Sequence, residues 1–107
     1  IKNANISFCI SYSKRNAVAS ISAESSKKDA TDILKRIFNE KEDYISKELG
    51  IKVSLESGIR NENVYRLLIR KDIDDTENLL KYSSFIAEKF IEFKNIIENE
   101  VKIILNN

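Results

Sequence analysis

Five basic side chains are the residues of this chain best suited to bind a ligand. Each lies in, or just beside, a segment whose alternating polarity predicts a β-strand: Arg15, Lys52, Arg60, Arg66 and Arg70. An arginine guanidinium can donate two parallel hydrogen bonds to one phosphate, and a lysine adds a compact positive charge. Serine residues alternate along the same segments and leave room for a backbone to approach. We therefore take these five residues as candidate contacts with DNA.

The charge of the chain is divided between its predicted strands and its predicted helices. Residues 1–26 and 51–72 hold eight Lys and Arg against four Asp and Glu, whereas the helical remainder holds ten against thirteen. The net charge of the whole chain is only +1. Because a domain that binds nucleic acid unaided is usually more basic, an ordinary solvated sheet face remains the alternative interpretation.

No arrangement of side chains in the sequence indicates catalysis. Histidine, the usual general base and the commonest metal ligand, is absent, and the two glycines stand alone instead of forming a phosphate-binding loop. The acidic-x-lysine spacing of magnesium-dependent nucleases occurs only at residues 92–94 and 100–102, inside a predicted helix instead of a strand. We therefore expect no catalytic residue, no metal site and no cofactor in this segment.

Two further features have structural explanations. An acidic cluster lacks the loop spacing of a calcium site and suits the positive end of a helix: Asp72, Asp74, Asp75 and Glu77. Cys9 has no histidine or basic cluster near it in sequence that would lower the pKa of its thiol. We expect Cys9 to be a small, half-buried strand residue, and a single cysteine fits a reducing compartment.

Strict alternation of polar and apolar residues predicts four short strands, at residues 6–12, 17–23, 51–56 and 65–70. Turns are expected between the members of each pair. One side of the strands is apolar and suits a core. The other side is small, polar and basic: Ser7, Cys9, Ser11, Ser20, Ser22, Lys52, Ser54, Arg66 and Arg70. On this open side we expect DNA or another domain to bind.

Each pair of strands is followed by a predicted helix. The first helix begins at a capping box formed by Ser26 and Asp29 and ends at Gly50. The second runs from Asp74, its candidate N-cap, to Leu105. This ββαββα order predicts an α+β fold, a two-layer sandwich with a four-stranded mixed sheet and both helices on one face. Strands two and three are expected to run parallel.

The second helix is too long for the sheet beneath it. At 1.5 Å per residue it would run about 48 Å, against about 23 Å for a seven-residue strand. Its apolar residues nevertheless form one continuous stripe: Tyr82, Ile86, Phe90, Phe93, Ile97, Val101 and Ile104. We expect the far part of the stripe to form a dimer interface with a second chain: Phe93, Ile97, Val101 and Ile104. A break near Asn95 that folds the tail back over the core is the alternative.

Length and composition indicate one soluble domain. The 107 residues allow a single core, so we expect one α/β domain over residues 1–107. Because the chain contains no methionine and begins at Ile1, we expect it to be the C-terminal segment of a longer protein. No apolar run reaches the length of a membrane span and no signal peptide is visible, so we expect a cytoplasmic location and no membrane partner.

Several stretches of the chain resemble one known family. They are the serine-rich first strand with Ala17-Val18-Ala19 after it, Ile33-Leu34, the helix end at 41–50, Tyr65-Arg66-Leu67 and the acidic residues 74–77. Together they are similar to the uncharacterised prokaryotic domain family DUF4268, and the likeness spans nearly the whole chain. This resemblance implies a domain at the C-terminal end of proteins whose N-terminal part looks like a restriction-type nuclease or another DNA-handling module. It brings no catalytic residues with it.

These observations together predict a non-catalytic accessory domain of a prokaryotic DNA-handling protein of the restriction or defence type. The domain would serve assembly, as a homodimer or against the N-terminal domain of the parent protein, with DNA contact on the open sheet face. A stand-alone nucleic-acid-binding module is the first alternative. A protein-interaction module unrelated to DNA is the second.

Overall fold

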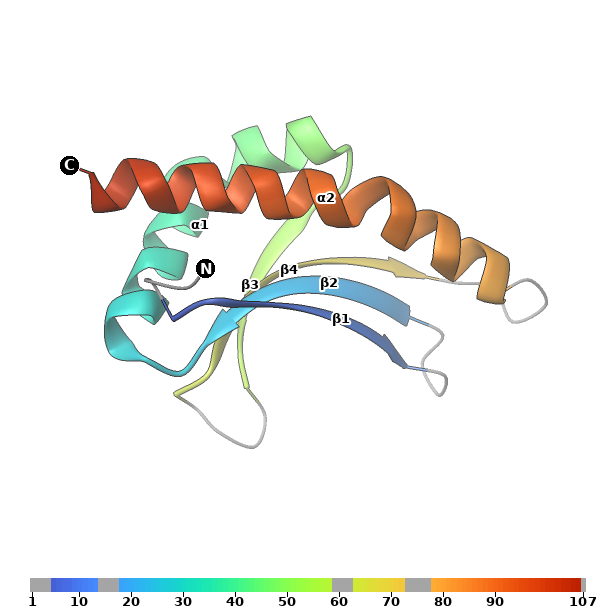
Figure 1. Cartoon of the computed structure of the whole chain (residues 1–107), viewed down its shortest axis with the longest axis horizontal. Coiled ribbons are helices and arrows are strands. Elements are labelled where there is room, and N and C mark those ends of the chain that lie inside the picture. The colour runs from blue at the N-terminus through green and yellow to red at the C-terminus, as the bar shows by residue number, and fades with distance from the viewer. Residues whose placement is uncertain (1–4, 14–17, 59–62, 73–77, 107) are drawn as a thin grey trace.

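The computed structural model describes residues 5–13, 18–58, 63–72 and 78–106. Over these residues the chain forms six elements: β1 (Ser7–Ser13), β2 (Val18–Ser25), α1 (Lys28–Leu49), β3 (Val53–Ser57), β4 (Tyr65–Asp72) and α2 (Asn78–Leu105). Figure 1 shows the four strands as one layer and the two helices as a second. The predicted α+β class and the order ββαββα are confirmed.

The sheet has the strand order β1-β2-β4-β3 and is antiparallel throughout. The expectation of a mixed sheet is therefore wrong. β2 and β3 do run in the same direction, but β4 lies between them and pairs with each in the antiparallel sense. The central place of β4 fits its apolar run Leu67, Leu68 and Ile69, which are all buried.

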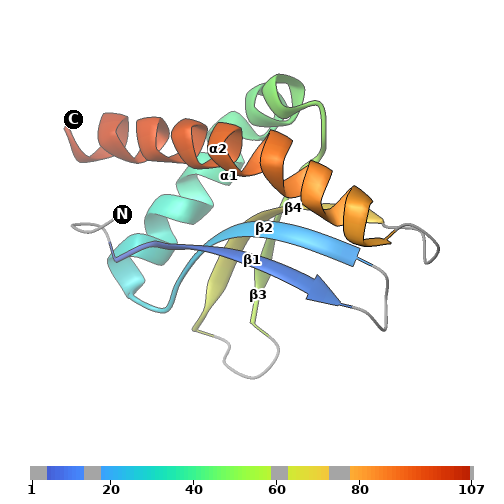
Figure 2. The same ribbon diagram turned by 45° about the vertical axis from the view of Figure 1, so that its right-hand side comes forward.

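One core fills the space between the sheet and the helices. Alternate strand residues such as Ile21, Val53 and Ile69 pack there against Leu34 of α1 and Phe85 of α2. α1 lies mainly over β3 and β4, whereas α2 lies over β2 and β1. In Figures 1 and 2 both helices are on the same side of the sheet, and its other side is not covered by either of them.

The ends of α1 show one correct and one wrong expectation. Gly50 terminates the helix in the left-handed conformation, with φ 67°, and the amides of Gly50 and Ile51 donate to the carbonyls of Lys47 and Ser46. At the other end the capping box is wrong: Lys27 occupies the N-cap position, and no side chain caps the helix. The hydroxyl of Ser25 instead accepts a hydrogen bond from the Lys27 amide at 3.1 Å.

α2 is a continuous helix from Asn78 to Leu105, without a break at Asn95. Its expected start at residues 74–77 lies outside the described residues. The helix extends past the sheet and packs on α1, where the Lys89 ammonium donates to the carbonyl of Leu49 at 2.7 Å. Neither helix, over the residues described, has an apolar stretch able to cross a bilayer.

The far part of the α2 stripe belongs to the core of the chain itself. Phe93, Ile97 and Val101 have no exposed surface, and Ile104 is partly buried against the same cluster. The ring of Phe93 meets that of Phe8 edge to face, with 6.2 Å between centroids. These side chains are therefore not available as the dimer interface that the sequence suggested. The reason is that α1 supplies the cover that the short sheet does not.

Candidate functional site

The side of the sheet opposite the helices is the most distinctive surface of the molecule, and we call it the serine face. Its centre is formed by Ser11 on β1, Ser20 and Ser22 on β2, and Leu68 on β4. Because successive strand residues point to opposite sides, these residues share one side while their neighbours enter the core. The face is hollowed, with a volume of about 540 Å³ over β1, β2 and β4.

The floor of the hollow is small and closely packed. Ser22 and Leu68 are direct cross-strand partners, and both are buried although no helix covers them. Leu68 is only 3% exposed, because it lies between the long side chains of Arg66 and Arg70 on the same strand. Ser11 and Ser20, also direct partners, join their hydroxyls in a hydrogen bond. The surface thus offers hydroxyl groups and aliphatic area at the bottom of a depression.

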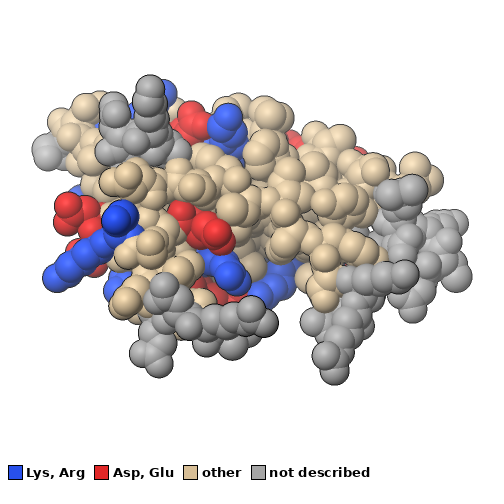
Figure 3. All heavy atoms as spheres, turned by 60° about the horizontal axis from the view of Figure 1, so that its bottom comes forward, with Lys and Arg blue, Asp and Glu red and all other residues tan. Residues whose placement is uncertain are grey.

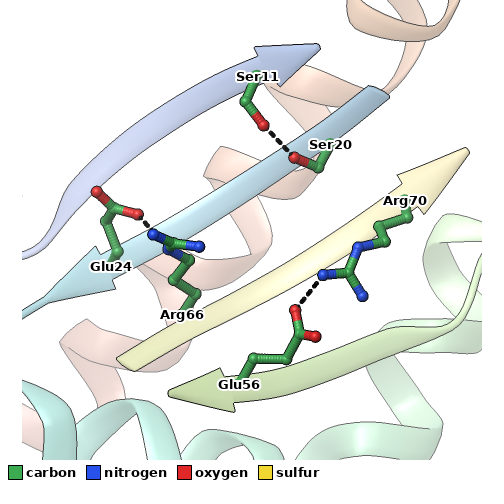
Figure 4. A network of polar contacts seen from close by, with 6 residues as sticks. All are labelled: Ser11, Ser20, Glu24, Glu56, Arg66 and Arg70. Carbon is green, nitrogen blue, oxygen red and sulfur yellow. Dashed lines mark hydrogen bonds and ion pairs between the residues drawn. The ribbon is translucent and has the colours of Figure 1, made fainter. Parts of the chain in front are cut away.

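Two arginines flank this floor, and each is held by a glutamate of the neighbouring strand. Arg66 Nε donates to Glu24 Oε2 on β2 at 3.0 Å, and Arg70 pairs with Glu56 on β3. Figure 4 shows the two ion pairs pointing in opposite directions away from β4. The arginine side chains remain 44% and 50% exposed. Exposed pairs of this kind contribute about 0–1 kcal/mol, so a competing anion can displace the glutamates at small cost.

The serine face is consequently balanced in charge where the sequence suggested a basic surface. In Figure 3, acidic and basic side chains lie beside one another on this side of the molecule, among larger uncharged areas. Glu24 and Glu56 are the residues that the sequence analysis missed. Their positions opposite arginines follow from the strand order, since Glu24 and Glu56 both stand across from Arg66, on either side of β4.

The structure brings together two of the five predicted DNA contacts. Arg66 and Arg70 are on the same side of β4, with Leu68 between them, and both line the hollow. Lys52 is exposed just before β3. Arg15 and Arg60 lie outside the described residues. The site therefore rests on Arg66 and Arg70.

Cys9 lies on the serine face beside Glu24, and its environment suppresses the thiolate. Burial raises the pKa of the Cys9 thiol above its usual value, and a hydrogen bond to Glu24 and the charge of that carboxylate raise it further. Arg66 acts in the opposite direction but more weakly. A thiol with a raised pKa is a poor nucleophile at neutral pH, so nothing in this geometry gives Cys9 a catalytic part.

Metal chemistry finds no support in the part of the chain that the structure describes. No three acidic, cysteine or histidine side chains are grouped there in a way that could hold an ion. Of the acidic cluster noted in the sequence, Asp72 is exposed at the end of β4, and Asp74, Asp75 and Glu77 lie outside the described residues. Comparison of the chain with family models, curated proteins and solved structures gave no significant match.

Proposed function

We propose that this chain is a non-catalytic accessory domain of a larger DNA-handling protein, and that its serine face makes an auxiliary contact with the DNA backbone. The observation that supports the contact is the hollow itself: small hydroxyl-bearing residues at its floor and two half-exposed guanidinium groups at its sides. The DNA-handling parent is what the family resemblance implies. A role in assembly forms part of the same proposal.

The expected DNA contact is weak and small. Arg66 and Arg70 can each bind one phosphate, and serine hydroxyls can donate to phosphate oxygens between them. Two phosphate contacts give a slope of about −1.8 in a plot of log affinity against log salt concentration. Affinity should then fall roughly tenfold between 50 and 200 mM salt. Such a contact adds to the binding of a larger protein but does not locate a sequence, because phosphates carry no base information.

Replacing the glutamates and replacing the arginines should change DNA affinity in opposite directions. When Glu24 and Glu56 are both replaced by glutamine, the arginines lose their competing partners. The bound phosphates also no longer lie beside two negative charges. At about 7 Å in water each such charge opposes a phosphate by about 0.6 kcal/mol, so binding should strengthen roughly sevenfold at low salt. Replacing Arg66 and Arg70 by alanine should abolish the salt dependence and weaken binding equally for all sequences.

Fluorescence polarisation with a labelled duplex at low salt is the measurement. Arg36→Ala is the control, because Arg36 is 50% exposed, as Arg70 is, and forms an ion pair with Glu40 at 3.1 Å, but lies on α1. It should bind as the wild type does. Equal binding by Arg66→Ala/Arg70→Ala and Arg36→Ala would refute contact through the serine face. If even Glu24→Gln/Glu56→Gln fails to bind at low salt, the DNA proposal is wrong and a protein-interaction module takes its place.

A further inference from the structure

Over the described residues, β1 is an edge strand, and its own seven residues carry none of the features that usually protect such an edge. Among the described residues its one strand neighbour is β2. Its seven residues, SFCISYS, include no charge and no proline. Exposed edges in natural sheets are normally short, or carry lysine, proline or a bulge, because their backbone groups otherwise pair with another strand. β3, the opposite edge, is shorter and carries Glu56.

The middle residue of β1 is apolar and open to solvent. Ile10 points to the helix side of the sheet, as Phe8 and Tyr12 do, yet it is 40% exposed. The helix covers the residues on either side of it, through Phe8 against Phe93 and Tyr12 against Tyr82. Ile10 is left uncovered at the edge.

Phe90 of α2 lies on the side of the helix that faces away from α1. Lys89 reaches the carbonyl of Leu49 on α1, and at about 100° per residue Lys89 and Phe90 fall on opposite sides of Phe93, which contacts Phe8 of β1. Phe90 is partly buried against the core. β1 pairs with β2 along one edge, and along its other edge it has no strand neighbour among the described residues.

We propose that β1 pairs in the antiparallel sense with β1 of a second copy of this chain, about a twofold axis at Ile10. This operation places Ile10 opposite its own copy, Phe8 opposite Tyr12, and Cys9 opposite Ser11. Apolar residues then meet apolar residues on the helix side, and small polar residues meet on the serine face. A twofold interface must be complementary to itself, because the same strand lies on both sides of it. Like charges close to the axis would then face each other and repel. β1 satisfies this condition because it has none.

The area of this interface predicts a weak dimer. A seven-residue strand is about 23 Å long, and a sheet with a helix layer above it is about 20 Å deep. Each copy would bury roughly 500 Å², and the total of roughly 1,000 Å² is near the lower limit for a specific interface. The inference rests on the assembly role proposed above but does not depend on DNA contact. A negative DNA-binding result by fluorescence polarisation would therefore leave the dimer proposal intact, and a monomeric chain in sedimentation would leave the DNA proposal intact.

Sedimentation velocity of the whole chain, from about 1 µM to about 1 mM, tests the pairing. The wild type should shift from 12.3 kDa toward twice that mass as concentration rises. Ile10→Lys should remain a monomer throughout, because two lysines would meet at the axis. Ile103→Lys is the control: Ile103 is an apolar residue 54% exposed at the far end of α2, and its variant should dimerise normally. A monomeric wild type, or equal behaviour of the two variants, would overturn the proposal.

A cross-link keeps the test valid if Ile10→Lys does not fold. Directly opposite antiparallel residues have Cα atoms about 4.5–5.5 Å apart, which a disulfide can bridge. In a Cys9→Ser background, Ile10→Cys should give a covalent dimer with oxidised glutathione, whereas Ile103→Cys should not. Absence of the Ile10→Cys cross-link at concentrations where the chain is dimeric would refute the twofold axis at Ile10.

Discussion

Truncation of Phe93 to alanine is the change that examines the packing of α2 most sharply. The side chain is fully buried, and its ring meets Phe8 of β1 edge to face. It therefore joins the far half of the helix to the edge of the sheet. If Phe93 instead lay at an interface between chains, its loss would leave the isolated chain nearly as stable as before.

The size of the effect follows from burial and ring geometry. Truncating a buried phenylalanine costs about 3–5 kcal/mol, and an edge-to-face pair accounts for about 0.5–1.5 kcal/mol beyond the buried area. We expect a loss of about 4 kcal/mol in the free energy of unfolding. For a domain of this size that corresponds to a fall in melting temperature of roughly 15–30 °C. Because small domains are stable by only about 5–15 kcal/mol, this loss would remove a large part of the total stability.

Urea unfolding followed by far-ultraviolet circular dichroism measures this loss. Ile91→Ala is the matched control, because Ile91 lies two residues away on the same helix and is 57% exposed. Its variant should change stability by less than about 0.5 kcal/mol. A loss below about 1 kcal/mol for Phe93→Ala, or one that appears only at high protein concentration, would refute the assignment of Phe93 to the core.

Three further substitutions test separate parts of the structure. Lys89→Met removes the charged hydrogen bond to the Leu49 carbonyl, and denaturant titration should show that the free energy of unfolding falls by about 1.5–3 kcal/mol. An unchanged free energy of unfolding would mean that this contact does not hold the two helices together. Gly50→Ala should cost about 1 kcal/mol in the same assay, purely from its positive φ, because no atom lies within 4 Å of the added methyl group. The raised pKa of the Cys9 thiol makes its stabilising contribution complete below the unfolded pKa of about 8.5, and this contribution is lost as pH rises through the folded pKa. Urea titrations at about pH 8 and about pH 10 should therefore show a larger loss for the wild type than for Cys9→Ser, and equal losses would contradict the role of burial.

Local patterns in the sequence were enough to predict the elements and the side on which each residue lies. Alternation around Ser20 and Ile21 separated the serine face from the core, because a strand has a period of two whatever its neighbours are. Gly50 marked the end of α1 because few other residues adopt its conformation. These features depend on residues close together in the chain.

Features that depend on which elements are neighbours were not predictable in the same way. Alternation does not identify the strand beside β4, so the ion pairs of Arg66 and Arg70 with Glu24 and Glu56 were missed. The sheet alone is too short for α2, and the cover that α1 adds depends on how the two helices pack, which the sequence pattern of α2 does not contain. At the start of α1, two adjacent serines could each bond the backbone, and the choice of Ser25 depends on where β2 ends.

An amide chemical-shift titration of the chain with duplex DNA at low ionic strength tests the role of the serine face most directly. Contact through this face predicts that the largest shifts fall on Ser20, Ser22, Leu68 and Arg70, fade as salt is added, and spare Arg36 on α1. Shifts concentrated on the helices, or no shifts at low salt, would contradict the proposed function.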